Sequence, residues 1–362
     1  MGRSSELQRR PIRMLDLTGS PAERGRTHGS AHSAEIRSYA EERLRLSYEG
    51  TWAGRRAHPR AALKLAEECL PAHQEYSPEL FDEMVATGQA AGLTPAEMVV
   101  VGGLTDFVDV VRARLGAAPF EDTCTAFLVA DKAAEGAGYL GQTWDMHATA
   151  EPFVVMLRIK PIDGPKVLVY STVGCLGQMG LNEAGIAVGI NNLSADNGKP
   201  GVTWPFVVRK ALEQTTLDEA LQCVLDADLA GAHNFLLFDS NGRGFNVEAM
   251  PGRSHVEALE NDMLVHTNHC LSPETRALEA PRPPELEASS EARLRRAEEL
   301  LKERPLTSES LFEVTRDDII CRQGGHPYYA ATCGAAIMRP ATGDFWAVWG
   351  LPAHYEYEQF VL

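Results

Sequence analysis

The sequence changes character at Cys124, and this change restricts the folds that the chain can adopt. Residues 14 to about 117 carry apolar residues at helical spacing, with Ser20-Pro21, Ser77-Pro78 and Thr94-Pro95 as cap and first-turn pairs. From Cys124 onward, short apolar runs alternate with Gly, Pro and Asp turns, which is typical of hairpins in an antiparallel sheet.

Two helical stretches, residues 203–227 and 289–305, interrupt these strand-like runs, and residues 278–292 have the Pro- and Glu-rich composition of a linker. We therefore expect an α+β fold of four layers, αββα. Two antiparallel sheets lie between helical layers, and the helical first third packs on this sandwich.

Charge and cysteine content exclude several classes of function. The 34 basic and 50 acidic residues give a formal charge of −16, which works against binding nucleic acid or an anionic membrane surface. No apolar run is long enough to span a bilayer, and the first residues lack the apolar stretch of a secretory signal. The seven scattered cysteines contain no CxxC pair, so we expect reduced thiols in a cytoplasmic protein. We expect no cofactor and no metal site.

Cys124 stands directly before a strand-like run, TAFLV, and its chemistry depends on a base. One source is a histidine, because His147, His266, His269 and His326 lie near polar turns. Another is the α-amino group that Cys124 itself would carry if the preceding peptide bond were cut, since the pKa of such an amine is near neutrality. A buried structural thiol is the third interpretation. Composition and spacing do not choose among the three.

Eight stretches of the chain, in this order, resemble a known family. They are GSPAERGRTHG, CTAFLV, LGQTWDMH, MGLNEAGIAVGINNL, HNFLLFDSNGRGFNVE, VHTNHCL, IICRQGGHP and ATCGAAIMRPATGDFWAVWGLP, which span Gly19 to about Pro352. The set resembles the acyl-coenzyme A:6-aminopenicillanic acid acyltransferase (isopenicillin N acyltransferase) family of self-cleaving N-terminal nucleophile hydrolases. The resemblance implies a four-layer sandwich and acyl-transfer chemistry.

The resemblance also implies roles for the matched residues. Cys124 takes the position of the nucleophile, Asp145 that of the aspartate that orients the freed amine, and Asn268 that of the amide that donates to the oxyanion. Arg322 is assigned as the basic residue near the nucleophile, with Arg316 as the alternative. Trp144 and His147, which lie beside Asp145 in the QTWDMH motif, are assigned to substrate binding.

Self-cleavage between Thr123 and Cys124 follows from the same resemblance. It would divide the chain into a mostly helical fragment, residues 1–123, and a fragment of residues 124–362 that carries the nucleophile, the two forming one αββα domain. The family often has Gly before the nucleophile. Thr123 is β-branched and crowds its own carbonyl, so we expect slower processing.

The function expected from these residues is nucleophilic cleavage of a small-molecule amide or acyl thioester through an acyl-enzyme, with water or an amine as the acceptor. Two alternatives stay open: a papain-like Cys-His hydrolase without self-cleavage, and a catalytically silent binding protein on the same fold. Two structural expectations accompany them. Asn182, Asn191 and Asn192 are expected in hairpin turns, and the charged run from Glu291 to Arg304 on a solvated helix face.

Overall fold

The computed structural model describes residues 7–48, 58–115, 124–326 and 329–362. Thr123, one side of the expected cleavage point, lies outside the described residues. The helices are α1 (Pro21–Ala31), α2 (Ser33–Tyr48), α4 (Pro59–Tyr76), α5 (Pro78–Ala91), α6 (Pro95–Leu115), α7 (Trp204–Leu212), α8 (Leu217–Leu225), α9 (Pro273–Arg276), α10 (Pro284–Leu300) and α11 (Ser308–Arg316), with short 3-10 turns η1 (Asp131–Ala133) and η2 (Ala148–Phe153).

The strands form two sheets within the described part of the chain. The larger sheet has the order β1 (Met14–Gly19), β4 (Val154–Pro161), β5 (Val167–Thr172), β6 (Met179–Asn182), β7 (Ile186–Asn192), β8 (His233–Asp239), β9 (Gly244–Met250), β10 (Arg253–Ala258). The smaller sheet has the order β11 (Met263–His266), β2 (Thr125–Val129), β3 (Tyr139–His147), β12 (Ala330–Arg339), β13 (Asp344–Trp349), β14 (Glu358–Val361).

The two sheets and their helices form the four layers expected from the sequence. Helices α7 and α8 pack on strands β6 to β9 of the larger sheet, and α10 and α11 pack on β2, β3, β11 and β12 of the smaller one. The sheets face each other through β2 and β3 on one side and β7 and β8 on the other. The fold is therefore an αββα sandwich, as predicted.

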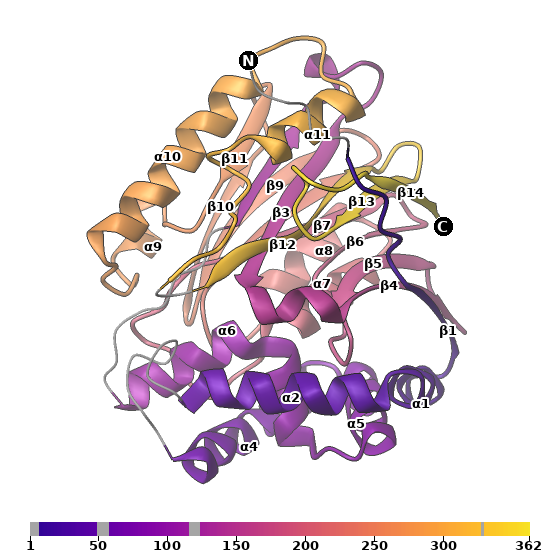
Figure 1. The fold of residues 1–362 in the computed structure, drawn as a ribbon, viewed down its shortest axis with the longest axis vertical. Coiled ribbons are helices and arrows are strands. Elements are labelled where there is room, and N and C mark those ends of the chain that lie inside the picture. Colours follow the sequence, from indigo (N-terminus) through magenta and orange to yellow (C-terminus); the bar gives the residue numbers. More distant parts are fainter. Residues whose placement is uncertain (1–6, 49–57, 116–123, 327–328) are drawn as a thin grey trace.

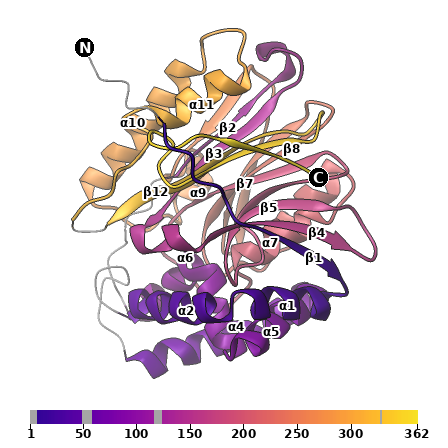
Figure 2. The same cartoon turned by 45° about the vertical axis from the view of Figure 1, so that its right-hand side comes forward.

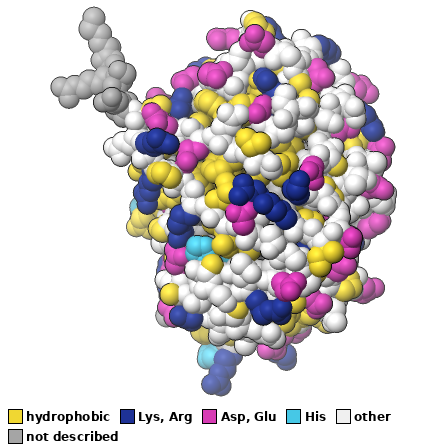
Figure 3. Space-filling model, turned by 90° about the vertical axis from the view of Figure 1, so that its right-hand side faces the viewer, with side chains coloured by type: hydrophobic (Ala, Val, Ile, Leu, Met, Phe, Trp, Pro, Cys, Tyr) yellow, Lys and Arg dark blue, Asp and Glu magenta, His cyan; other side chains and the backbone are white. Residues whose placement is uncertain are grey.

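The helices of the first third gather at one end of the two sheets rather than along their faces (Figures 1 and 2). The expected caps form there: Ser20 and Glu23 make a capping box at the start of α1, and the Ser77 side chain accepts from Leu80 N at the start of α5. On the face that Figure 3 shows, acidic and basic side chains are interspersed and an apolar area lies near the middle.

Four local predictions were wrong. Residues 14–19 form strand β1 rather than a helix, and β1 pairs with β4 in parallel, so the larger sheet is not antiparallel throughout. Part of the segment predicted as a linker, residues 278–292, begins α10. Asn191 and Asn192 lie within β7; only Asn182 serves a turn, where its Oδ1 accepts from Ile186 N at 2.9 Å. The fourth correction concerns the run from Glu291 to Arg304 and is described with the site.

Gln142 of β3 joins the two sheets directly. Its side chain is fully buried, its Oε1 accepts from Ile190 N of β7 at 2.7 Å, and its Nε2 donates to Ile190 O. The pairing of β6 with β7 covers only Ala187 and Val188, so Ile190 lies beyond it. The Gln142 amide therefore takes the place of a neighbouring strand for both polar groups of Ile190.

We predict that Gln142→Leu lowers the free energy of unfolding by about 2–4 kcal/mol, because it leaves a buried N–H and a buried C=O without partners. Urea denaturation monitored by circular dichroism measures the loss. Gln222→Leu is the matched control, since Gln222 is exposed and bonds only Asp226 in the described structure. Equal stability of the Gln142→Leu and Gln222→Leu proteins would contradict this role.

Candidate active site

Cys124 lies at the start of β2, and its buried thiol rests against the backbone of Asp145. Asp145 N donates to Cys124 Sγ at 3.3 Å, and the thiol lies 3.6 Å from Asp145 O. The pairing of Thr125 with Thr143 fixes this arrangement, because it places the residues before Thr125 beside those after Thr143. The antiparallel register thus brings two residues 21 positions apart into contact.

Asp145 is fully buried on β3, and its carboxylate is oriented by Thr332 of β12. Thr332 Oγ1 donates to Asp145 Oδ1 at 2.7 Å, and the same oxygen accepts from Arg322 N at 2.9 Å. The pairing of β12 with β3 shifts register just after Thr332, at a bulge that contains Cys333. The bulge ends the regular ladder beside the aspartate, as is common next to active sites.

Asn268 follows β11 and is also fully buried. His266 pairs with Ala126, so continuing the antiparallel register by two residues places Asn268 opposite Cys124. Its Oδ1 accepts from Arg293 Nη2 at 2.9 Å, and its Nδ2 donates to Asn192 O at 3.0 Å. These two partners fix which end of the amide is the donor, and the second N–H of Nδ2 stays available for a ligand.

Arg293 of α10 contacts Cys124 through its guanidinium. Its Nη1 donates to Cys124 O and to Thr125 Oγ1, the latter at 3.1 Å, and its Nη2 bonds Asn268. Only 1% of Arg293 is exposed, so the prediction of a solvated face from Glu291 to Arg304 was wrong at this residue. The sequence carries one signal for it: Leu286, Ser290 and Ala297 recur at helical spacing and place Arg293 on the same stripe.

The two arginines considered from the sequence make other contacts in the described structure. Arg316 Nε donates to Pro352 O at 3.0 Å, and its Nη1 pairs with Glu313. Arg322 is linked to Asp145 through its backbone, since its N donates to Thr332 Oγ1 and its O accepts from Thr332 N. The catalytic role of Arg322 stays a prediction.

The two residues assigned to substrate binding lie on or near the site strand. Trp144 is buried beside Tyr170, with ring centroids 6.2 Å apart, and continuing the β2–β3 register places it opposite Cys124. His147 ends β3, and its Nδ1 lies 2.7 Å from Thr149 Oγ1. Burial lowers the pKa of His147 from its ordinary value.

Two of the candidate histidine bases are engaged in holding the turn after β11. His266 Nδ1 lies 2.9 Å from Thr267 O, and His266 Nε2 lies 2.9 Å from Glu248 Oε1. Both ring nitrogens of His266 thus face oxygen atoms, Nδ1 that of a backbone carbonyl and Nε2 that of a carboxylate. His269 Nδ1 lies 2.7 Å from Ser290 Oγ, and burial lowers its pKa to about 4. Neither ring is arranged as a free acceptor.

Glu248 of β9 holds this turn in place through hydrogen bonds from its carboxylate. Besides His266, its carboxylate accepts from Leu271 N, Ser272 N and Thr275 Oγ1. Burial by itself raises the pKa of Glu248, but the hydrogen bond and charge of His266 together with the other donors outweigh burial and lower it to about 2. Glu248 therefore positions the segment that carries Asn268.

We predict that Glu248→Gln loses about 3 kcal/mol of unfolding free energy at pH 7. The folded-state pKa is depressed, so this stabilisation is present above the unfolded pKa of 4.5 and disappears as the pH falls toward 2. Denaturant titrations at pH 7, 5, 4 and 3 should show the wild-type advantage shrinking in the acid range. Glu274→Gln, an exposed change in the same segment, should show no such trend. A constant difference at every pH would contradict the assignment.

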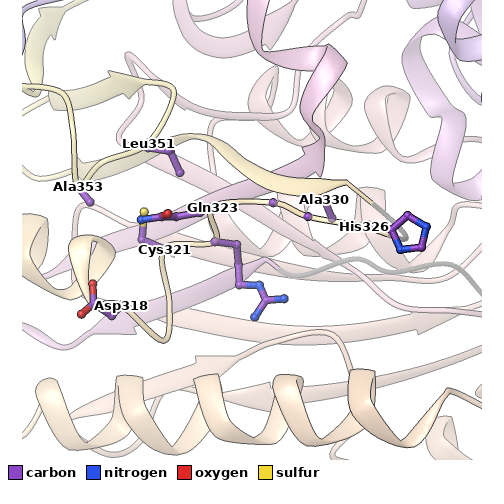
Figure 4. A pocket seen from close by; sticks show the side chains of 10 residues that line it. Asp318, Cys321, Gln323, His326, Ala330, Leu351 and Ala353 are labelled. Atoms are coloured by element: carbon purple, nitrogen blue, oxygen red, sulfur yellow. The ribbon is translucent and has the colours of Figure 1, made fainter.

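An open pocket of about 390 Å³ lies beside this site (Figure 4). Its walls include Arg322, Cys321, His326 and Ala330, and Ala330 pairs with His147 at the end of β3. Burial raises the pKa of the Cys321 thiol to about 11, so this sulfur stays protonated at neutral pH. The pocket thus opens where β3 ends and β12 begins, and its wall residue Arg322 is linked to Asp145 through Thr332.

A model of the family described as acyl-coenzyme A:6-aminopenicillanic acid acyl-transferase matches residues 132–353. The chain belongs to this family. The match confirms the resemblance seen in the sequence and includes Asp145, Asn268, Arg293 and Arg322. Membership supports an enzyme of acyl transfer or amide hydrolysis.

Similar proteins carry related activities in their names. The chain is 28% identical over 264 residues to the 40 kDa form of acyl-coenzyme A:6-aminopenicillanic-acid-acyltransferase from Emericella nidulans, covering 71% of this chain and 70% of that one. Among solved structures, the chain is similar to a conjugated bile acid hydrolase mutant from Clostridium perfringens. The identity is 10% and the TM-score is 0.42, over 66% of this chain and 97% of that one. It is also similar to the N-acylethanolamine-hydrolyzing acid amidase ortholog of Caenorhabditis elegans, with 15% identity and a TM-score of 0.43 over 66% of this chain and 100% of that one. Both TM-scores are below 0.5, so the fold is assigned from the topology of the chain itself.

The described residues were also searched for a membrane-spanning helix and for a metal site. Among the described residues, no helix combines the length and apolar character needed to cross a bilayer. Within the same residues, no group of three or more His, Cys, Asp or Glu side chains is placed to hold a metal ion.

Proposed function

We propose that this protein is a self-processing amide hydrolase or acyltransferase whose nucleophile is the thiol of Cys124. Cleavage between Thr123 and Cys124 would give fragments 1–123 and 124–362 and place a free α-amine on the nucleophile residue. The substrate would be a small-molecule amide or acyl thioester. The observation that carries the proposal is the convergence of Asp145, Arg293 and Asn268 on a strand-start cysteine.

The geometry supports an α-amine as the base more than a histidine. The amine would be attached to the same residue as the thiol, so covalent bonds would fix their separation. Both ring nitrogens of His266 lie against oxygen atoms of Thr267 and Glu248, and His269 bonds Ser290. A papain-like mechanism would need one of these rings released from its partners, or a histidine from the pocket edge.

The proposed reaction proceeds in two acyl transfers. The thiol sulfur attacks the substrate carbonyl carbon while the α-amine takes the thiol proton. The ammonium then gives a proton to the departing nitrogen, and the acyl group remains on sulfur. Water or an acceptor amine next attacks the thioester, and the α-amine again accepts and returns the proton. Asp145, which lies against the Cys124 thiol through its backbone, would hold the ammonium form.

Asn268 would stabilise the oxyanion that forms in each transfer. Arg293 and Asn192 O hold its amide in one orientation, so the remaining N–H needs little reorganisation when charge develops. Arg293 would act indirectly, because its guanidinium fixes both Asn268 and the carbonyl of Cys124. The amide N–H of Asn268 would thus be a preorganised hydrogen-bond donor beside β11, an edge strand of the smaller sheet.

We predict that purified wild-type protein contains a fragment that begins at Cys124. Intact-mass measurement and N-terminal sequencing after long incubation detect it, and Cys124→Ala protein should remain one chain because it lacks the attacking thiol. Thr123→Gly should be processed faster than wild type, since it relieves the crowding at the scissile carbonyl. Wild-type protein that keeps a single N-terminus at residue 1 or 2 would rule out self-cleavage.

We predict that Asn268→Ala lowers kcat by about 100- to 1,000-fold on an accepted amide with little change in KM, because its N–H acts on charge that exists only in the transition state. Steady-state kinetics on the processed protein measure both constants. Asn241→Ala is the control, since Asn241 is exposed in the turn between β8 and β9. A change confined to KM would remove Asn268 from the oxyanion site.

A further inference from the structure

Three arginines are among the largest fully buried side chains of the protein, and two of them have evident acceptors. Arg209 pairs with Glu83, with Arg209 Nη1 3.0 Å from Glu83 Oε1. Arg293 bonds Cys124 O and Asn268 Oδ1. The third, Arg43 of α2, has no comparable set of acceptors.

Arg43 is only 1% exposed, yet most of its guanidinium is unsatisfied. Its Nη2 donates to Tyr39 Oη one helical turn earlier, and its guanidinium carbon lies 4.4 Å from the centre of the Tyr39 ring. Within the described residues, Nε and Nη1 of Arg43 have no hydrogen-bond partner. Because the side chain does not reach the surface, bulk solvent does not satisfy these donors.

No anion of the described chain compensates the charge of Arg43. No described carboxylate forms an ion pair with it, and the neighbouring Glu42 instead pairs with Arg45 and accepts from Thr149. Burial raises the pKa of Tyr39, so its phenol stays protonated at neutral pH. An isolated buried cation is strongly unfavourable, which points to an anion supplied from outside the chain.

The size of the cavity that Arg43 lines limits which anion this is. The cavity has room for about one water-sized group. Carboxylate, phosphate and sulfate groups are larger than this space, whereas a halide ion is only slightly larger than a water molecule. Its walls come from both sides of Cys124 and include Tyr39 and Thr105 before it and Trp144, Met146, Gln178 and Trp204 after it.

The unsatisfied donors favour a halide over a water molecule in this space. Nε of Arg43 carries one N–H and Nη1 carries two, and a water accepts at most two hydrogen bonds and brings no charge. A halide accepts hydrogen bonds from every direction and cancels the charge of the guanidinium. Gln178 is consistent with an anion, because its Oε1 has no hydrogen-bond partner among the described residues, and exchanging the ends of its amide turns this atom into a donor.

We propose that the Arg43 cavity binds a single halide ion, physiologically chloride. The ion would neutralise the Arg43 guanidinium at the place where α2 and α6 meet β3, β5 and α7, and would thereby stabilise the packing of the helical first third on the sandwich. This inference is independent of the proposed function, because it depends only on the buried guanidinium and the cavity.

The first test is the dependence of Tm on chloride. Wild-type protein is dialysed into sodium gluconate, and chloride then replaces gluconate at constant ionic strength. Because chloride would bind only the folded protein, Tm should rise and then level off, with an increase of about 3–4 °C at roughly 100 times the Kd. Gluconate is too large for the cavity and serves as the reference anion. A Tm that is the same at every chloride fraction would overturn the proposal.

Substitutions locate the effect at Arg43. Arg43→Met should remove the dependence of Tm on chloride. Arg26→Met makes the same change in net charge at an exposed position of α1 and should keep the dependence. Full chloride dependence in a folded Arg43→Met protein would overturn the proposal.

Bromide provides a test that needs no variant. Bromide should raise the Tm of wild-type protein as chloride does, and anomalous scattering from crystals soaked in sodium bromide should place one bromide in contact with the Arg43 guanidinium. Bromide found only beside exposed arginines would show adventitious ions only and overturn the proposal. A water molecule at Arg43 in the same crystals would show a hydration site and overturn it as well.

Discussion

The contacts of Arg293 hold the candidate active site together. One guanidinium reaches from α10 to the carbonyl of Cys124, which precedes β2, and to the side chain of Asn268, which follows β11. Ser290 on the same face of α10 bonds the backbone of Asn268, so the helix fixes this residue at two points. Without these contacts, a buried amide and a buried carbonyl would lose their partners, and the geometry around the thiol would lose its main constraint.

The register of the paired strands fixes the rest of the geometry around the Cys124 thiol. The β2–β3 ladder places the thiol against Asp145, the β3–β12 ladder brings Thr332 to the carboxylate, and Gln142 ties β3 to the opposite sheet. Asp145 lies within strand β3, and Cys124 and Asn268 lie directly beside the ends of β2 and β11, so the sheet positions the groups that would act on substrate. Buried arginines connect the helices to this framework, as Arg293 of α10 does through Cys124 O.

The sequence predicted the layers because strand and helix periodicities differ and because the caps at Ser20 and Ser77 are local signals. It did not predict β1, since this six-residue strand exists only by pairing with β4 far along the chain. Arg293 was missed because a charged run usually marks solvent, and only tertiary packing buries one member of it. Asn192 contributes through a backbone carbonyl, which no side-chain pattern reveals. Resemblance located Asp145 and Asn268, and their contacts came from the fold.

The measurement that tests the central claim most directly is the position of an acyl group on the reacting protein. Wild-type protein is mixed with 4-nitrophenyl acetate, quenched in acid to retain thioesters, digested with pepsin and analysed by mass spectrometry. The account predicts an acetyl group on Cys124, in a peptide whose own N-terminus is Cys124. Acetylation of a different thiol with Cys124 unmodified, or of Cys124 still joined to Thr123 in protein that turns over amides, would contradict it.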